Sequence, residues 1–308
     1  MSNSGVSAAA ARHRSHSDPI KTGDNVSGQT GSNRTMRRPR IGARQRAPSD
    51  DQTLRLGPGL RGTALRCRTA DGVDLAGVHL PGPRNRPAFV IGHGFTHGLR
   101  EPATRAVLAE FARHGGVAAA DFRGHGHSGG RSSVGRDETL DLDAVVHWTR
   151  GQGYHLVVVV GFSMGAAVAL RHAAVGSSPG DAVVSVSSPS RWYIRESAPM
   201  RRVQWLLESP FGLLVGRGLG VRLGEPWFDL PASPVEAIGV ISSPTLLVHG
   251  TADAYFHPGH VLTLQRASTD AEVWIEPGMG HGETATTSDL VDRIATWSAG
   301  AGPAVDPS

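Results

Sequence analysis

The chain has 308 residues, of which 31 are Lys or Arg and 27 are Asp or Glu, giving a formal net charge of +4. This length fits one large α/β domain or two small ones, with ample material for a buried core. A single cysteine excludes an internal disulfide and suits a reducing compartment, so we expect a cytoplasmic location. No signal peptide is visible, and the most apolar stretch, residues 156–170, is too short to be an integral membrane segment.

Residues 1–52 form a basic, Ser/Arg-rich tail that we expect to be disordered. Residues 1–50 contain nine Arg or Lys, three Asp and no Leu, Phe, Tyr or Trp, a net charge of +6. Such a segment cannot bury enough apolar surface to offset the entropy of ordering it. Two further hypotheses stay open: nucleic-acid binding by the tail, and translation that starts at Met36. Residues 301–308 are expected to be a flexible C-terminus.

From residue 53 onward, strand-like and helix-like segments alternate. Residues 65–80 alternate in polarity around Asp71-Gly72, which predicts an antiparallel hairpin. Apolar runs within 88–94, 117–126, 156–162 and 182–189 predict buried strands, with helices near 101–111, 140–150 and 164–170 between them. After residue 236, strands are expected within 245–253 and 272–282, with a helix near 260–267 and a last helix around 290–297. Strands that alternate with helices predict a mainly parallel sheet covered on both faces.

Residues 190–236 break this alternation. The segment is rich in aromatic residues, leucines, glycines and prolines, which predicts an inserted cap of short helices over one end of the sheet. Trp192, Trp205 and Trp227 are candidates for the wall of a substrate pocket, although aromatic residues here also suit the core of the cap itself.

Polar side chains follow three of the predicted strands. Ser163, Asp253 and His281 stand in this chain order, each just after an apolar run. Ligands of open parallel sheets bind beyond the carboxyl ends of the strands, so we expect the three to converge there. A serine hydroxyl becomes a nucleophile when a base removes its proton, and histidine suits that task because its pKa lies near neutrality. An aspartate on the other ring nitrogen orients the imidazole.

The stretch Gly161-Phe-Ser163-Met-Gly165 fits the pattern G-x-S-x-G between a strand and a helix. In that pattern the serine occupies a strained turn, and the glycines are needed where strand and helix pass closely. The same turn aims the backbone N–H of Met164 at the oxygen of a tetrahedral intermediate.

Other residues compete for these roles. Asp121 and Asp137 are alternative acids, but the former is expected to anchor its own turn and the latter lies on a polar loop. His249, His257 and His260 are alternative bases; the first is expected to be a packing residue, and the other two follow Asp253 too closely to face it.

Two histidine pairs, His93 with His97 and His125 with His127, suggest a metal site. No acidic or cysteine ligand stands at a suitable spacing, so we expect neither a metal nor a cofactor. Residues 124–129 formally fit G-x-G-x-x-G, but no helix opens after them, and we reject a dinucleotide site.

Residues 53–300 resemble the α/β-hydrolase superfamily of serine esterases and lipases. HGF at 93–95 resembles its oxyanion loop, DFRGHGHS at 121–128 its turn after the fourth strand, and GFSMG at 161–165 its nucleophile elbow. DAYF at 253–256 and GMGHGE at 278–283 resemble its acid and histidine loops.

The resemblance implies a mainly parallel eight-stranded sheet with a small helical cap. It also implies that Ser163 is the nucleophile, His281 the base and Asp253 the orienting acid. The backbone N–H groups of Phe95 and Met164 would form the oxyanion hole. His93 is a candidate pocket residue, although its expected task is to hold the oxyanion loop.

We therefore expect a serine hydrolase that cleaves a small-molecule carboxylic ester through an acyl-enzyme. The apolar cap favours a hydrophobic or short lipid-like ester. Thioesterase, acyltransferase or perhydrolase activity on the same fold, or a non-catalytic binding module, are the alternatives. Acyl chain length and oligomeric state stay open.

Overall fold

The computed structural model describes residues 53–57, 60–225 and 229–301. The tail of residues 1–52 with Met36, the candidate Trp227 and residues 302–308 lie outside the described residues.

The described residues form one sheet of nine strands in the order β1-β2-β3-β5-β4-β6-β7-β8-β9. β1 to β3 pair antiparallel with their neighbours, and the remaining pairs are parallel. The strands are β1 (Thr53–Gly57), β2 (Leu60–Arg68), β3 (Asp74–Leu80), β4 (Ala88–Gly92), β5 (Gly116–Ala120), β6 (Val157–Phe162), β7 (Ala182–Val186), β8 (Thr245–Gly250) and β9 (Glu272–Glu276). The predicted mainly parallel sheet is confirmed.

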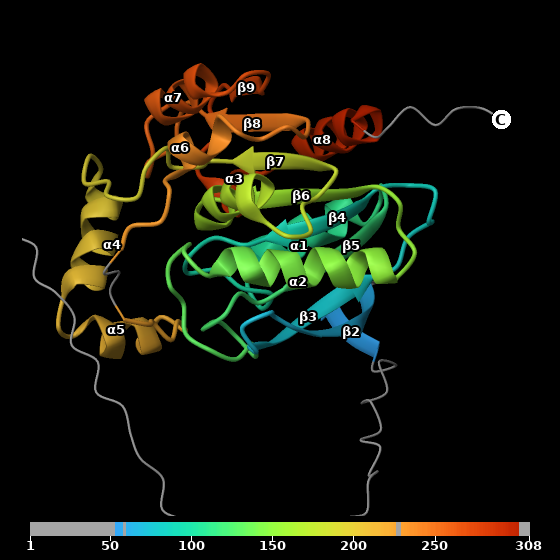
Figure 1. Ribbon diagram of the computed structural model, residues 1–308, viewed down its shortest axis with the longest axis horizontal. Coiled ribbons are helices and arrows are strands. Elements are labelled where there is room, and N and C mark those ends of the chain that lie inside the picture. Colours follow the sequence, from blue (N-terminus) through green and yellow to red (C-terminus); the bar gives the residue numbers. More distant parts are fainter. Residues whose placement is uncertain (1–52, 58–59, 226–228, 302–308) are drawn as a thin grey trace, which may run out of the picture. The chain divides into compact units, whose positions relative to one another are not determined.

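Helices cover both faces of this sheet, also as predicted (Figure 1). They are α1 (Pro102–Phe111), α2 (Glu138–Gly151), α3 (Met164–Val175), α4 (Ala198–Glu208), α5 (Gly212–Gly218), α6 (Pro234–Ile238), α7 (Gly259–Ala267) and α8 (Ser288–Gly300), with a 3-10 turn η1 (Gly282–Ala285). α2, α3, α6 and α7 contribute to one core, and α1 and α8 to the other. Within the described part of the chain, no helix is long and apolar enough to cross a membrane.

The four consecutive valines of β6 explain why this strand lies at the centre of the sheet. Val157 and Val159 point into the core on one face, and Val158 and Val160 into the core on the other. All four are buried. Each fully buried valine contributes roughly 1.5–3 kcal/mol relative to an exposed one, so β6 holds whatever follows it rigidly.

The antiparallel edge includes one strand that the sequence pattern did not predict. β2 and β3 form the expected hairpin, in which Gly72 adopts a positive φ of 86°. β1 adds five residues outside β2, and its register shifts between Arg55 and Gly57. A strand this short, which ends at Gly57 and is followed in the sequence by Pro-Gly, carries too few alternating residues to be recognised.

Three helices lie between β7 and β8. α4 and α5 stand beyond the carboxyl ends of the parallel strands (Figure 1). α6 begins with a capping box in which the Ser233 N–H donates to Glu236 Oε2 at 2.7 Å. Its Ala237 and Ile238 are buried, and the helix packs on α3 and α7. α6 therefore covers the sheet, although it starts within the segment where the cap was predicted.

Candidate functional site

Ser163, His281 and Asp253 meet at the carboxyl ends of β6, β9 and β8. Ser163 Oγ lies 2.8 Å from His281 Nε2, and His281 Nδ1 lies 2.7 Å from Asp253 Oδ2. Asp253 accepts a hydrogen bond from His281 Nδ1–H, which leaves Nε2 without a proton and able to accept a hydrogen bond from the serine hydroxyl. The three side chains thus form one hydrogen-bonded chain, as the strand-end positions predict.

Ser163 sits in a turn that only its neighbours make possible. Its backbone has φ 53° and ψ −116°, a sparsely populated region for a residue with a Cβ. A Cβ on Gly161 would lie 2.2 Å from Gly165 O, and a Cβ on Gly165 would lie 2.3 Å from Gly92 O. The two glycines therefore let α3 pack directly against β6 and β4, and this packing keeps the strained serine in place.

The Asp253 carboxylate is buried, and both of its oxygens accept hydrogen bonds. Its Oδ1 accepts the backbone N–H groups of Tyr255 and Phe256, and its Oδ2 faces His281. Burial alone raises the pKa of Asp253, but the hydrogen bonds from His281 and from these two amides outweigh it and hold the pKa below its usual value. The lowered pKa favours the ionised form of Asp253, which can act as a counter-charge to a protonated His281.

Two aromatic rings hold the imidazole of His281. Tyr255 stacks on it with ring centroids 4.3 Å apart and an interplanar angle of 25°, and Phe256 meets it edge-on at 5.3 Å. Both residues belong to the acid loop, so the loop that orients Nδ1 also fixes the plane of the ring.

The two backbone N–H groups predicted to form an oxyanion hole belong to Phe95 and Met164, and both residues line the space above Ser163. Among the described residues, neither the Phe95 nor the Met164 N–H has a hydrogen-bond partner. Met164 is the first residue of α3, so its N–H also lies at the positive end of the helix dipole. Unpaired donors beside a serine hydroxyl suit the stabilisation of a tetrahedral oxyanion.

The peptide groups around Phe95 are held by side chains from two other segments and by His93 of the same loop. The Gly94 N–H donates to Glu283 Oε1 at 2.7 Å, and His125 Nε2 lies 2.6 Å from Phe95 O. His93 Nδ1–H donates to Gly94 O, while its Nε2 accepts the Phe122 N–H at 2.9 Å. Burial, reinforced by the nearby His125, holds the pKa of His93 well below its usual value, so the ring stays neutral.

A cavity of about 950 Å³ opens above Ser163. Its lining combines two members of the hydrogen-bonded chain, Ser163 and His281, with Phe95 and Met164. Most of the opposite wall comes from residues 189–213, including Trp192, Met200, Leu206, Leu207 and Leu213. The wall is therefore built largely by the segment around α4 and α5.

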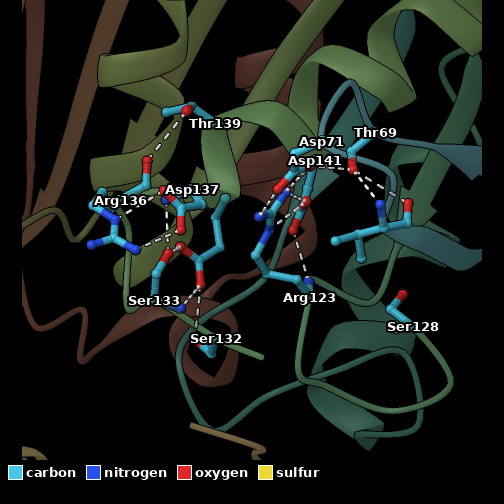
Figure 2. Close-up of polar contacts among 12 residues, drawn as sticks. Thr69, Asp71, Arg123, Ser128, Ser132, Ser133, Arg136, Asp137, Thr139 and Asp141 are labelled. Carbon is cyan, nitrogen blue, oxygen red and sulfur yellow. Dashed lines mark hydrogen bonds and ion pairs between the residues drawn. The ribbon is translucent and has the colours of Figure 1, made fainter. Parts of the chain in front are cut away.

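Another wall of the cavity, residues 131–134, includes Ser132 and Ser133 (Figure 2), which the buried carboxylate of Glu138 holds in place. Glu138 Oε1 accepts the Ser132 hydroxyl at 2.8 Å and the Ser133 N–H at 2.9 Å. Beside them, Arg123 lies between Asp71 and Asp141, at 2.7 and 2.8 Å. These bonds fix the loop between β5 and α2, which explains why Val134 can hold a positive φ of 55°.

Comparison with known proteins places these features in a family. The model of the alpha/beta hydrolase family matches residues 88–295, more than half of the chain. The chain belongs to the alpha/beta hydrolase family. No curated protein sequence matches the hydrolase.

Solved structures share the fold of this hydrolase at low sequence identity. An esterase from Pyrococcus furiosus is 23% identical with a TM-score of 0.59, and the match covers 77% of this chain and 91% of that one. An alpha/beta hydrolase from a Penicillium species is 18% identical with a TM-score of 0.61, covering 79% and 99%. An esterase from a Rhodococcus species is 19% identical with a TM-score of 0.58, covering 78% and 99%.

The candidate pocket residues of the hydrolase are dispersed. Trp192 lines the cavity, and its Nε1–H donates to Pro231 O at 2.9 Å. Trp205 does not line it and is 58% exposed, because α4 turns Gln204 and Leu206 inward instead. His93 is buried and does not line the cavity.

The competing acids and bases have other partners. Asp121 accepts the backbone N–H groups of Leu99 and His127, and Asp137 pairs with Arg136. His249 Nε2 bonds to Phe256 O, and His260 Nδ1 lies 2.9 Å from Ser190 Oγ. Among the described residues, no three His, Cys, Asp or Glu side chains gather as a metal-binding group.

Glu283, His125 and the two rings of Tyr255 and Phe256 were not predicted as site residues. Glu283 stands two residues after His281, in a motif that was recognised, but its partner Gly94 is 189 residues away. No local pattern connects such a pair. A buried carboxylate beside the histidine loop becomes visible only when the loops are in place.

Proposed function

We propose that the protein hydrolyses carboxylic esters through an acyl-enzyme on Ser163. The observation that carries this proposal is the continuous hydrogen-bonded chain from Ser163 Oγ through His281 to Asp253, with distances of 2.8 and 2.7 Å. Family membership and the esterase names among its structural neighbours support the same reaction class.

In the first half-reaction, Ser163 Oγ attacks the ester carbonyl carbon while its proton passes to His281 Nε2. The carbonyl π electrons move to the oxygen, where the N–H groups of Phe95 and Met164 stabilise the negative charge. Asp253 stabilises the imidazolium. The intermediate then collapses, His281 returns the proton to the leaving alcohol, and an acyl-enzyme remains.

In the second half-reaction, His281 takes a proton from water, whose oxygen attacks the acyl carbon. The same two N–H groups stabilise the second tetrahedral intermediate. Its collapse breaks the bond to Ser163 Oγ, and His281 protonates the serine. The carboxylic acid leaves, and the enzyme returns to its starting state.

The substrate we propose has a hydrophobic acyl or alcohol portion. Residues 190–225 would act as the cap, because their Trp192, Met200, Leu206 and Leu207 side chains face Ser163 across the cavity. An apolar wall of this kind binds hydrocarbon by removing it from water.

The test combines covalent labelling with ester turnover. We expect a fluorophosphonate probe to label the wild-type protein and Ser178→Ala, a control serine remote from the cavity, but not Ser163→Ala. With p-nitrophenyl esters, Ser163→Ala, His281→Ala and Asp253→Asn should each lower kcat by about 10⁴-fold or more, with an unchanged circular dichroism spectrum. Full turnover by Ser163→Ala would disprove the mechanism.

Matched acyl groups on oxygen, sulfur and amine leaving groups then distinguish the related activities. We expect the oxygen ester to have the highest kcat/KM. A clear preference for the thioester, or product formed only when an alcohol acceptor is added, would replace ester hydrolysis by thioesterase or acyl-transfer activity on the same Ser163.

A further inference from the structure

Helix α5 has its apolar side chains on the outside. The helix Gly212–Gly218 buries Gly212 and Gly216, whereas Leu213 is 52% exposed and Leu214 is 70% exposed. Phe211, just before the helix, is 67% exposed. A surface helix in a protein surrounded by water turns its apolar stripe inward, so this arrangement is the reverse of the usual one.

Close backbone packing fixes the helix in this orientation. A Cβ on Gly212 would lie 2.0 Å from Leu206 O, and a Cβ on Gly216 would lie 3.0 Å from Leu223 Cδ1. The backbone at Gly212 leaves no room for a side chain, and a side chain at Gly216 would have to displace Leu223. Rotation that buried Leu213 or Leu214 would therefore force a bulky side chain into a space that holds only glycine.

The exposed residues form what we call the α4–α5 patch. Its members are large apolar side chains at the end of α4 and along α5: Trp205, Phe211, Leu213, Leu214, Val215 and Leu219. Single exposed apolar residues are ordinary on protein surfaces, but six within fifteen residues mark an interaction surface.

The charge around the α4–α5 patch is positive. Residues 191–222 contain six arginines and two glutamates, a net of +4. Glu196 and Glu208 pair with Arg191 and Arg195. Three other arginines of the segment are exposed and form no ion pair with any described residue: Arg201, Arg202 and Arg217. The patch therefore suits a partner that is apolar and carries negative charge at its boundary.

The α4–α5 patch is continuous with the cavity above Ser163. Leu213 belongs to both, because it is half-exposed and also lines the cavity. Leu206, Leu207 and Gly212 line the cavity from the same two helices. A partner bound to the patch would thus lie where an apolar molecule enters the cavity.

We propose that the α4–α5 patch docks the protein on an anionic lipid surface, with the apolar side chains at the acyl boundary and the arginines among the headgroups. Tryptophan and arginine beside exposed leucine and phenylalanine have the chemistry of an interfacial contact. The tail is not a suitable occupant, since residues 1–50 have no Leu, Phe, Tyr or Trp and carry a charge of the same sign. The proposal goes beyond ester hydrolysis because docking needs no reaction at Ser163.

The test is co-sedimentation of full-length protein with phosphatidylcholine vesicles, with and without phosphatidylglycerol, in the Ser163→Ala background. Phe211→Ser combined with Leu214→Ser should weaken partitioning into both kinds of vesicle at least about tenfold. Arg202→Gln with Arg217→Gln should weaken binding about 10- to 30-fold, and only to the anionic vesicles. Val240→Ser is the matched control, because Val240 is 70% exposed, as Leu214 is, but lies outside the patch.

Two results would overturn the proposal. One is that the patch variants and the control bind vesicles as the parent protein does, which would assign any binding to the basic tail that all of them keep. The other is a dimer of the parent protein, seen by light scattering, that the Phe211→Ser and Leu214→Ser pair abolishes without any vesicle binding. Loss of ester turnover has no bearing on either result, so the two proposals fail separately.

Discussion

Two pairs of glycines, each four residues apart, have opposite effects in this molecule. Gly161 and Gly165 let α3 pack against the sheet, and the packing holds Ser163 in a strained turn. Gly212 and Gly216 let α5 pack against Leu206 and Leu223, and this packing leaves the apolar side chains of α5 exposed. The first pair holds the Ser163 hydroxyl in place next to the core, whereas the second pair holds apolar side chains on the surface, away from the core.

The difference shows that the effect of close helix packing depends on the side chains that lie between the two glycines. At the elbow, the three residues between the glycines include the polar Ser163, and the surroundings are buried strands. In α5, the residues between the glycines are Leu213, Leu214 and Val215, and no described segment covers them. We therefore expect substitutions at the elbow to affect stability and rate, and substitutions of exposed α5 residues outside the cavity lining, such as Leu214 and Gly218, to leave both largely unchanged.

The largest effect is expected from Gly165→Ala. Its Cβ would lie 2.3 Å from Gly92 O and 2.6 Å from His93 O, both backbone atoms that cannot move aside. We expect the free energy of unfolding to fall by at least about 3 kcal/mol, with loss of esterase activity. Gly218→Ala is the control in α5, because a Cβ there meets nothing within 4 Å. Gly218→Ala should leave the free energy of unfolding in urea unchanged or raise it by up to about 1 kcal/mol. Equal losses of unfolding free energy in the two variants would contradict the difference between the elbow and α5.

A smaller effect, on rate rather than stability, is expected from Glu283→Ala. Without the carboxylate, the Gly94 N–H loses its partner and the Phe95 N–H is no longer held toward the reacting oxygen. We expect kcat to fall about 10- to 100-fold while KM stays nearly constant, because the contact operates in the transition state. Glu283→Gln keeps an acceptor oxygen and should recover most of the rate. A rise in KM with unchanged kcat would contradict this positioning role.

The contrast between the buried sheet and the exposed α5 can also be tested through the pH dependence of stability. Burial, together with the nearby Arg84, lowers the pKa of His79 to about 4, so the folded protein keeps this ring neutral. Between about pH 6.5 and pH 4 the unfolded chain binds more protons at this site, so stability falls as the pH falls through that window. His79→Gln should remove about 1–2 kcal/mol of this loss, measured by urea unfolding from pH 7 to pH 4. The Phe211→Ser and Leu214→Ser pair should keep the wild-type pH profile.

The parts of the site that the sequence predicted are those with local patterns. Ser163, Asp253 and His281 each follow an apolar strand within a few residues, so strand order alone brings them to one edge. Trp205 could not be oriented in this way, because Trp205-Leu206-Leu207 is apolar without a gap and gives no helical phase. The same holds for Leu213-Leu214-Val215 in α5. Contacts between distant segments, such as Glu283 with Gly94, leave no local pattern at all.

The position of β9 at the edge of the sheet also determines when the site can exist. His281 follows β9, and its partner Ser163 precedes it by 118 residues. During synthesis, Ser163 emerges and its elbow can form against β4 long before the histidine loop has been made. In the folded protein, His281 comes to Ser163 from the end of β9, which pairs with β8. A nascent chain would carry Ser163 without its histidine partner while the 118 residues from Ser163 to His281 are made. The first appearance of esterase activity would then report that the histidine loop had docked.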